Sequence, residues 1–245
     1  MSLNLRKAKV FDIQRGSMVD GPGVRTTVFF HGCDMRCQWC HNPEGFVIPS
    51  NYGFSEFRVK QYSVKELVDI VSEDIPFYGD GGGVTCSGGE CMLQSDFLLS
   101  FLKECKRKGI NTAIDTSGYV TFETFMKILP CTDLFLYDVK CITPQLHEKF
   151  TGVNNMRILS NLRALFSMGA NIIIRIPLVP EFNGNDGEFL KIKEFLSEFH
   201  PKAIEILPYH TLGCAKYEKL GMKCVEFTVP DEETVNKYKG ILGLN

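Results

Sequence analysis

The sequence predicts an α/β fold with a mostly parallel sheet, in a single domain over residues 1–245. From residue 25 onward, stretches rich in β-branched and aromatic residues alternate with amphipathic stretches of helical period, in about six strand–helix units. Such alternation implies parallel strands joined by right-handed crossovers. Six units are too few for a closed eight-stranded barrel. The sequence is therefore compatible with an open, partial barrel and with a doubly wound sheet.

The expected strands are short apolar runs bounded by turn residues. A first strand is predicted over residues 7–14, before the Asp-Gly-Pro-Gly turn at 20–23. The later strands are expected at 25–30, 81–90 (a strand and its turn), 111–114, 134–139, 171–177 and 203–207.

Helices are expected between these strands. Ser63 and Glu66 form a capping-box pattern that opens the first helix, which should run to about residue 72. Thr121 is expected to cap the helix that begins at residue 122. The other helices are predicted at 95–108, 143–150, 155–168, 186–199 and 231–242.

Composition narrows the classes of function. The chain is 44% hydrophobic and 23% charged with a net charge of -2, and it has no long basic run, so neither a nucleic-acid nor a membrane partner is expected. It has no apolar stretch of about 18 residues and no signal-like N-terminus, which predicts a cytoplasmic location. Residues 1–3 could be a cloning remnant. Ten cysteines in such a chain favour metal or redox chemistry over a disulfide framework, and Cys214 and Cys224 show no pairing pattern.

The stretch after the strand at 25–30 carries the strongest chemical signal. Cys33, Cys37 and Cys40 follow in a C-x3-C-x2-C spacing, and three thiolates on one loop can converge on one metal centre. An iron–sulfur cubane held by three cysteines leaves one iron open to bind a small molecule. The alternative is a zinc site completed by His41 or by a distant cysteine.

Further polar residues gather at the carboxyl ends of the predicted strands, where parallel α/β folds bind ligands. Each of these residues also has an ordinary structural explanation. The glycines can serve turns, Asp115 can form an Asx turn, and Asp138 with Lys140 can form a local ion pair. Arg175 can be a surface ion partner, and Trp39 can be a packed aromatic. Beside a three-cysteine loop, we interpret them jointly as one shared site. They are Trp39, Gly88, Gly89, Glu90, Asp115, Asp138, Lys140, Arg175 and His210.

Several motifs together resemble a known family. The chain resembles the radical S-adenosylmethionine (SAM) enzymes in two motifs. These are the three-cysteine motif with Trp39 before its last cysteine, and Ser-Gly-Gly-Glu at 87–90. Within these enzymes, the chain resembles the activating enzymes of glycyl radical enzymes along its whole length. The motifs of this second resemblance are Val-Asp-Gly-Pro-Gly at 19–23, Cys-His-Asn at 40–42, Gly-Gly-Val-Thr at 82–85, Asp-Thr at 115–116, Tyr-Asp-Val-Lys at 137–140 and Leu-Pro-Tyr-His at 207–210.

The resemblance implies a partial (β/α)6 barrel with its site at the strand carboxyl ends, a [4Fe–4S] cluster, SAM and a monovalent cation (Na⁺ or K⁺). It implies that SAM is cleaved reductively to a 5′-deoxyadenosyl radical, which takes hydrogen from a glycine of the partner enzyme. The implied cluster ligands are Cys33, Cys37 and Cys40. The implied SAM site comprises Trp39, Cys40, His41, Gly88, Gly89, Glu90, Asp138, Val139, Lys140, Arg175 and His210, with Lys140 and His210 also counted as catalytic. The implied cation site comprises Asp115, Thr116, Leu136 and Asp138, and Asp20 and Gly21 are expected to meet the substrate peptide.

One departure bears on the partner. Many activases carry an inserted ferredoxin-like segment with further cysteines after the first motif, whereas residues 42–78 contain none here. This favours the subgroup that acts on pyruvate formate-lyase, with flavodoxin or ferredoxin as the electron donor. Cys86 and Cys91 flank the Gly-Gly-Glu motif, as auxiliary thiols or as buried small apolar residues. A radical SAM enzyme acting on a small molecule and a zinc-binding structural module remain as alternatives.

Overall fold

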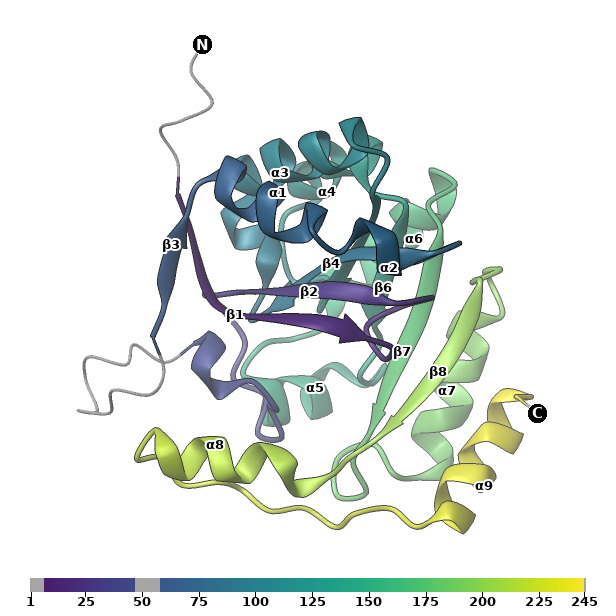
Figure 1. The fold of residues 1–245 in the computed structure, drawn as a ribbon. Helices are drawn as coiled ribbons and strands as arrows, with labels where there is room; N and C mark the ends of the chain where they lie inside the picture. The colour runs from purple at the N-terminus through teal and green to yellow at the C-terminus, as the bar shows by residue number, and fades with distance from the viewer. Residues whose placement is uncertain (1–6, 47–57, 245) are drawn as a thin grey trace. The chain divides into compact units, whose positions relative to one another are not determined.

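The computed structural model describes residues 7–46 and 58–244, which form two compact units (Figure 1). Unit 1 comprises residues up to Asp34, Glu44–Thr116 and Val120–Leu136. Unit 2 comprises Met35–Pro43, Ser117–Tyr119 and the chain from Tyr137 onward. The single domain stays a prediction.

The sheet of unit 1 has the strand order β3-β1-β2-β4-β5. The pairs β2–β4 and β4–β5 are parallel, as predicted, whereas β1 pairs antiparallel with both β2 and β3. The strands are β1 (Ala8–Ser17), β2 (Arg25–Phe30), β3 (Lys60–Tyr62), β4 (Gly83–Gly88) and β5 (Asn111–Thr116).

The two faces of this sheet differ in chemistry. The register places Thr27 beside Thr85 and Val28 beside Cys86. Because side chains alternate along a strand, Val28 and Cys86 share one apolar face, and Thr27 and Thr85 share the other. Thr27 and Thr85 are fully buried, so the second face carries buried polar groups.

Helices cover the apolar face of unit 1. In Figure 1, α1, α3 and α4 lie together along these strands. Leu98, Phe101 and Leu102 of α3 are fully buried in this layer. The helical elements of unit 1 are α1 (Val64–Ser72), α2 (Ile75–Tyr78), α3 (Ser95–Arg107), α4 (Phe122–Ile128) and the 3-10 turns η1 (Pro43–Gly45), η3 (Cys91–Gln94) and η4 (Leu129–Cys131).

The chain enters unit 2 within β6 (Leu134–Asp138), and β7 (Ile172–Leu178) pairs in parallel with β8 (Ala203–Pro208). Helix α9 lies against α7, and the ring of Tyr238 stacks on Phe189 at 4.1 Å (Figure 1). The helical elements of unit 2 are α5 (Pro144–Thr151), α6 (Met156–Ser167), α7 (Asp186–Leu196), the 3-10 turn η5 (Thr211–Gly213), α8 (Cys214–Lys219) and α9 (Glu232–Leu242).

The structure confirms the α/β class and the mostly parallel pairing, and it differs in detail. The first strand runs to Ser17, three residues beyond the expected end at 14, and β3, α2 and α8 were not predicted. The capping box of Ser63 and Glu66 is present, whereas Thr121 makes no side-chain cap hydrogen bond. Among the described residues, no helix has the length and apolar character needed to cross a membrane.

Candidate active site

The loop that carries Cys37 and Cys40 is fixed by backbone hydrogen bonds in unit 2. Its amides at Arg36 and Gln38 donate to the carbonyls of Thr151 and Phe150, at 2.8 and 3.0 Å. The amide of Cys40 donates to Cys37 O at 3.1 Å, which turns both cysteines into one tight bend. Neither thiol is part of a disulfide, and both residues are half-buried. The end of α5 therefore positions two of the predicted cluster ligands.

Trp39 anchors the same loop in an apolar cluster. Its indole stacks on Phe182 with the ring centroids 4.5 Å apart, and Phe182 contacts Phe150 at 5.2 Å. Cys141, Val179 and Tyr209 complete the buried cluster. Trp39 thus has the packing role that was its structural alternative, and its predicted contact with adenine stays a prediction.

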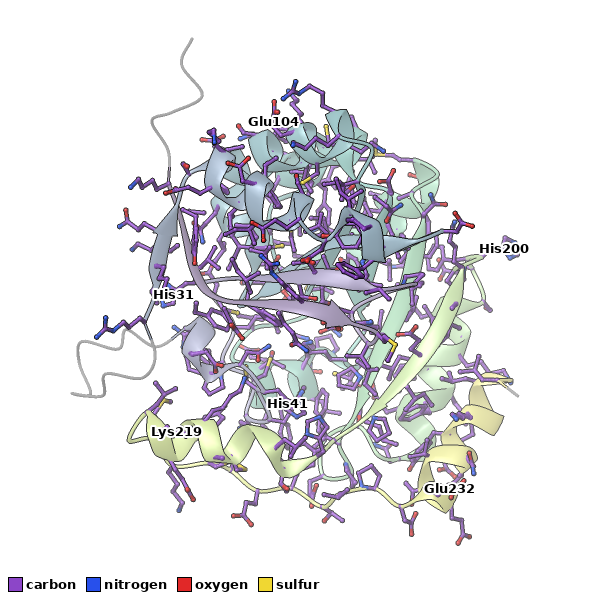
Figure 2. The ribbon with its side chains drawn as sticks, viewed as in Figure 1. His31, His41, Glu104, His200, Lys219 and Glu232 are labelled. Atoms are coloured by element: carbon purple, nitrogen blue, oxygen red, sulfur yellow. A yellow bond between two sulfur atoms is a disulfide. The ribbon has the colours of Figure 1, made fainter. Side chains whose placement is uncertain are left out.

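His41 and His210 lie together at the edge of this loop. Their ring centroids are 4.0 Å apart, and both line a pocket with Cys40 and Tyr209. Burial, with smaller effects from His210 and Lys216, lowers the pKa of His41 to about 4, so its ring is neutral near pH 7. Figure 2 shows His41 beside the segment of η5 and α8, and Gly213 of η5 packs against the backbone of His41.

Cys33 lies in unit 1, just after β2, where three backbone segments meet. Gly32 N donates to Gly45 O at 2.6 Å, and Glu90 N donates to Gly32 O at 2.7 Å. A Cβ atom on Gly89 would collide with Gly32 O, so only glycine allows this approach. Gly88 has φ +113°, which also favours glycine. The Gly-Gly pair therefore brings the end of β4 against the backbone next to Cys33, whose thiol is not part of a disulfide.

Two pairs of side chains lie at the strand ends of unit 1. Thr116 Oγ1 lies 3.0 and 2.9 Å from the two carboxylate oxygens of buried Glu90. Ser87 donates to Asp115 Oδ2 at 2.6 Å. The predicted residues Glu90 and Thr116 are thus brought together, whereas Asp115 lies with Ser87 on the opposite, polar face of the sheet. Leu136 is fully buried.

Asp20 is held over the same polar face. The hydroxyls of Ser17 and Thr27 both donate to its Oδ2, at 2.6 and 2.7 Å. Among the described residues, nothing donates to its Oδ1. Gly21 follows with φ +119°. The predicted peptide-contact residues thus form an ordered turn.

In unit 2, Asp138, Val139, Lys140 and Arg175 lie together at the ends of β6 and β7. Lys140 forms an ion pair with Asp138, and Val139 N donates to Arg175 O at 2.9 Å. Buried Arg175 also pairs with Glu205 Oε2 at 3.1 Å. Both local pairs match the structural alternatives for these residues and leave their predicted roles untested.

Three supporting residues were not predicted from the sequence. Asn183, fully buried, donates to Lys140 O at 2.8 Å and to Pro177 O at 2.6 Å, so it ties the ends of two strands. Arg25 and Thr85 lie beneath the Asp20 turn. An arginine opening an otherwise apolar strand was the available signal, because a buried charge needs partners.

The remaining cysteines fall into two groups. Burial raises the pKa of Cys86 and of Cys91 well above the ordinary value, so both stay protonated and act as small apolar residues. Cys214 and Cys224 form a disulfide, so the expectation that they show no pairing was wrong. Their separation of ten residues matches no metal or redox motif, so their pairing was not predictable from the sequence.

Within residues 7–46 and 58–244, no group of three or more His, Cys, Asp or Glu side chains is arranged as a metal-ion site. Cys33 belongs to unit 1, and Cys37 and Cys40 belong to unit 2. The shared cluster site and the cation site therefore stay predictions.

In this α/β fold, a three-cysteine loop follows the first parallel strand and a Gly-Gly-Glu turn follows the next. This combination defines the class of radical SAM proteins. The family model of the radical SAM superfamily matches residues 27–196, and the chain belongs to this superfamily. Within it, the relatives of this chain are activating enzymes of glycyl radical enzymes.

Two curated relatives and one solved structure illustrate the match. The trans-4-hydroxy-L-proline dehydratase activating enzyme of Clostridioides difficile is 37% identical over 284 aligned positions, which cover 94% of each chain. The pyruvate formate-lyase-activating enzyme of Clostridium pasteurianum is 36% identical over 233 positions, covering 94% of this chain and 93% of that one. A domain of the pyruvate formate-lyase-activating enzyme of Bacteroides vulgatus is 33% identical, with a TM-score of 0.58, over 66% of this chain and 94% of the domain.

The family uses a [4Fe–4S] cluster and SAM, and the residues present fit both groups. Iron–sulfur clusters are held by cysteine thiolates, and none of Cys33, Cys37 and Cys40 is consumed in a disulfide. The loop that carries Cys37 and Cys40 is fixed by the end of α5. In unit 2, the Lys140–Asp138 pair offers charged groups to an amino acid such as the methionyl part of SAM.

Proposed function

We propose that this protein activates pyruvate formate-lyase by removing a hydrogen atom from a glycine of that enzyme. The number of aligned positions, compared with the length of this chain, supports pyruvate formate-lyase as the target. The alignment with the hydroxyproline dehydratase activator needs 284 positions, more than the 245 residues present here, so that relative has inserted segments. The alignment with the Clostridium pasteurianum enzyme covers the same share of this chain in 233 positions. This agrees with the lack of cysteine in residues 42–78.

In this proposal, Cys33, Cys37 and Cys40 ligate the cluster. Gly88, Gly89 and Glu90 offer backbone and carboxylate groups to the methionyl amine of SAM, and Lys140 faces its carboxylate. When bound, the two cofactors supply one-electron cleavage of SAM and a carbon radical that takes a hydrogen atom.

Other residues shape the site around SAM. Neutral His41, with His210 beside it, forms a wall for the adenosyl group, and Trp39 fixes that wall through its stack on Phe182. Asp138, Val139 and Arg175 hold the ribose side.

The protein's own task toward the target is to admit a main-chain segment and keep water out. Asp20 Oδ1 would accept a backbone N–H of the target's glycine segment, because Oδ2 is already used by Ser17 and Thr27. A glycine suits this site since it has no side chain to block close approach.

A second target is favoured by identity alone. The hydroxyproline dehydratase activator is slightly more similar than the Clostridium pasteurianum enzyme, at 37% against 36%. A glycyl radical dehydratase is therefore the alternative partner. We further propose a flavodoxin or ferredoxin as electron donor, a monovalent cation held by Asp115, Thr116, Leu136 and Asp138, and a cytoplasmic location.

The test uses protein reconstituted anaerobically with iron and sulfide and reduced in the presence of SAM. We expect 5′-deoxyadenosine to form, and a glycyl radical doublet to appear by electron paramagnetic resonance when pyruvate formate-lyase is added. The control is the same target with its radical glycine replaced by alanine. SAM cleavage with no doublet on pyruvate formate-lyase, but a doublet on trans-4-hydroxy-L-proline dehydratase, would transfer the assignment to the dehydratase.

A further inference from the structure

Arg25 is a fully buried arginine that opens β2. Within the described part of the chain, each hydrogen bond of its guanidinium goes to a neutral oxygen. The acceptors are Thr85 Oγ1 (2.6 Å), Pro22 O (3.2 Å), Gly81 O (3.1 Å), Val84 O (2.7 Å), Asn111 O (3.5 Å) and Asn111 Oδ1 (3.1 Å). Burial lowers the pKa of Arg25 to about 10, which leaves it charged near pH 7. Burying a cation without a carboxylate partner costs free energy of folding. The role of Arg25 therefore lies in the groups to which it donates hydrogen bonds.

Two of those acceptors, Pro22 O and Thr85 Oγ1, connect Arg25 to the turn that carries Asp20. Arg25 donates directly to Pro22 O, in the middle of the turn. It also donates to Thr85 Oγ1, and this hydroxyl in turn donates to Asp20 O at 2.7 Å. The methylene Cδ of Arg25 would lie 3.0 Å from a Cβ on Gly21, so the turn rests directly on the arginine stem. Arg25 and Thr85 thus support the turn from below.

The upper side of the turn is exposed. Met18 and Val19 are 78% and 76% exposed, whereas the carboxylate of Asp20 is held from below by Ser17 and Thr27. Met18 and Val19 can pack against an apolar side chain of a bound peptide segment. Asp20 Oδ1 can accept a hydrogen bond from the main chain of the same segment.

We propose that Arg25 and Thr85 are positioning residues that hold the 18–23 turn in the conformation that receives the target's glycine segment. This inference rests on the proposed function. Neither residue touches the target. They act through Asp20 and Pro22, and through them they set the affinity for the target and not the cleavage of SAM.

The test compares Thr85→Val, which removes the relay hydroxyl at constant shape, with Thr85→Ser, which keeps it. The matched control is Thr112→Val. Thr112 is also a fully buried strand threonine, but its hydroxyl donates to Cys131 O, away from the turn.

The first readout is hydrogen exchange of the amides at 18–24, excluding proline, and it needs neither cofactor nor target. The loss of one hydrogen bond should speed exchange about three- to tenfold in Thr85→Val, and leave Thr85→Ser and Thr112→Val near the unchanged protein. Equal exchange in Thr85→Val and Thr112→Val would overturn the role of Thr85 in ordering the turn.

The second readout separates target recognition from SAM chemistry. Thr85→Val should raise the KM for the target about three- to tenfold, with unchanged formation of 5′-deoxyadenosine in the absence of target. An unchanged KM, or an equal loss of both activities, would overturn the inference. If the unchanged protein cleaves SAM but forms no radical on any target, the proposed function fails, and the exchange readout still decides whether Thr85 orders the turn.

Discussion

The hydroxyl of Thr116 lies within 3.0 Å of both carboxylate oxygens of Glu90. Glu90 is 2% exposed, so its charge depends on hydrogen bonds inside unit 1. Glu90 Oε1 also accepts from Met92 N at 3.4 Å, which joins the carboxylate to the start of η3. The carboxylate of the Gly-Gly-Glu turn is therefore held by the last residue of β5 and by its own following turn.

Replacing Thr116 with valine should lower the free energy of unfolding by about 1–3 kcal/mol, because a buried carboxylate loses a donor. Urea unfolding measured by circular dichroism gives this value. Thr116→Ser keeps the hydroxyl and should stay within about 1 kcal/mol of the unchanged protein. Equal losses in both variants would mean that packing of the methyl group, and not the hydrogen bond, stabilises this position.

Cys37→Ala should abolish the cluster, because a two-cysteine remnant cannot hold three irons of a cubane. After anaerobic reconstitution, iron content and the broad visible absorption should fall to near background. Cys131→Ala removes a half-buried thiol outside the site and should reconstitute normally. A Cys37→Ala protein with full iron content would remove Cys37 from the ligand set.

His147 should make stability depend on pH. Burial lowers its pKa to about 4, against a weaker opposing effect of its hydrogen bond to Val153 O. The unfolded chain takes up this proton near pH 6.5 and the folded protein only near pH 4. Its stabilising contribution is therefore complete above about pH 6.5 and is lost as the pH falls toward 4, by up to about 3 kcal/mol.

Urea unfolding between pH 4.5 and 7 measures this loss. His147→Asn carries no titrating group and can still donate to Val153 O, so its stability should fall less steeply over that range. The control His200→Asn changes an exposed histidine and should follow the unchanged protein. Parallel profiles for all three proteins would assign the pH dependence to other groups.

The disulfide between Cys214 and Cys224 should stabilise the segment that contains α8. Closing a loop of this length is worth about 2–3 kcal/mol in the chain-entropy model. The double variant Cys214→Ser/Cys224→Ser should therefore be cleaved faster by trypsin at Lys219 and Lys223 under non-reducing conditions. With a thiol reductant present, the unchanged protein should match the variant. Equal cleavage in both without reductant would show that packing alone orders the segment.

Local patterns were predictable, and non-local ones were not. The capping box of Ser63 depends on residues three apart, and the structure contains it. The antiparallel pairing of β1 was not predicted, because the sequence of one strand does not determine which strand it pairs with. The environment of Arg25 was missed for a similar reason, since its acceptors at Gly81 and Asn111 lie 56 and 86 residues away. Among the site residues, the cysteine and Gly-Gly-Glu motifs were visible, whereas buried Asn183 carries no motif at all.

The short strand β3 has a consequence for how copies of this chain behave at high concentration. It pairs with β1 over Lys60–Tyr62 and ends the strand order of unit 1. Its outer side offers only three residues of main chain to a neighbouring molecule, and Lys60 and Gln61 on it are exposed. A short edge that bears a charged side chain is a poor template for a further strand. The outermost strand of unit 1 thus guards against edge-to-edge aggregation.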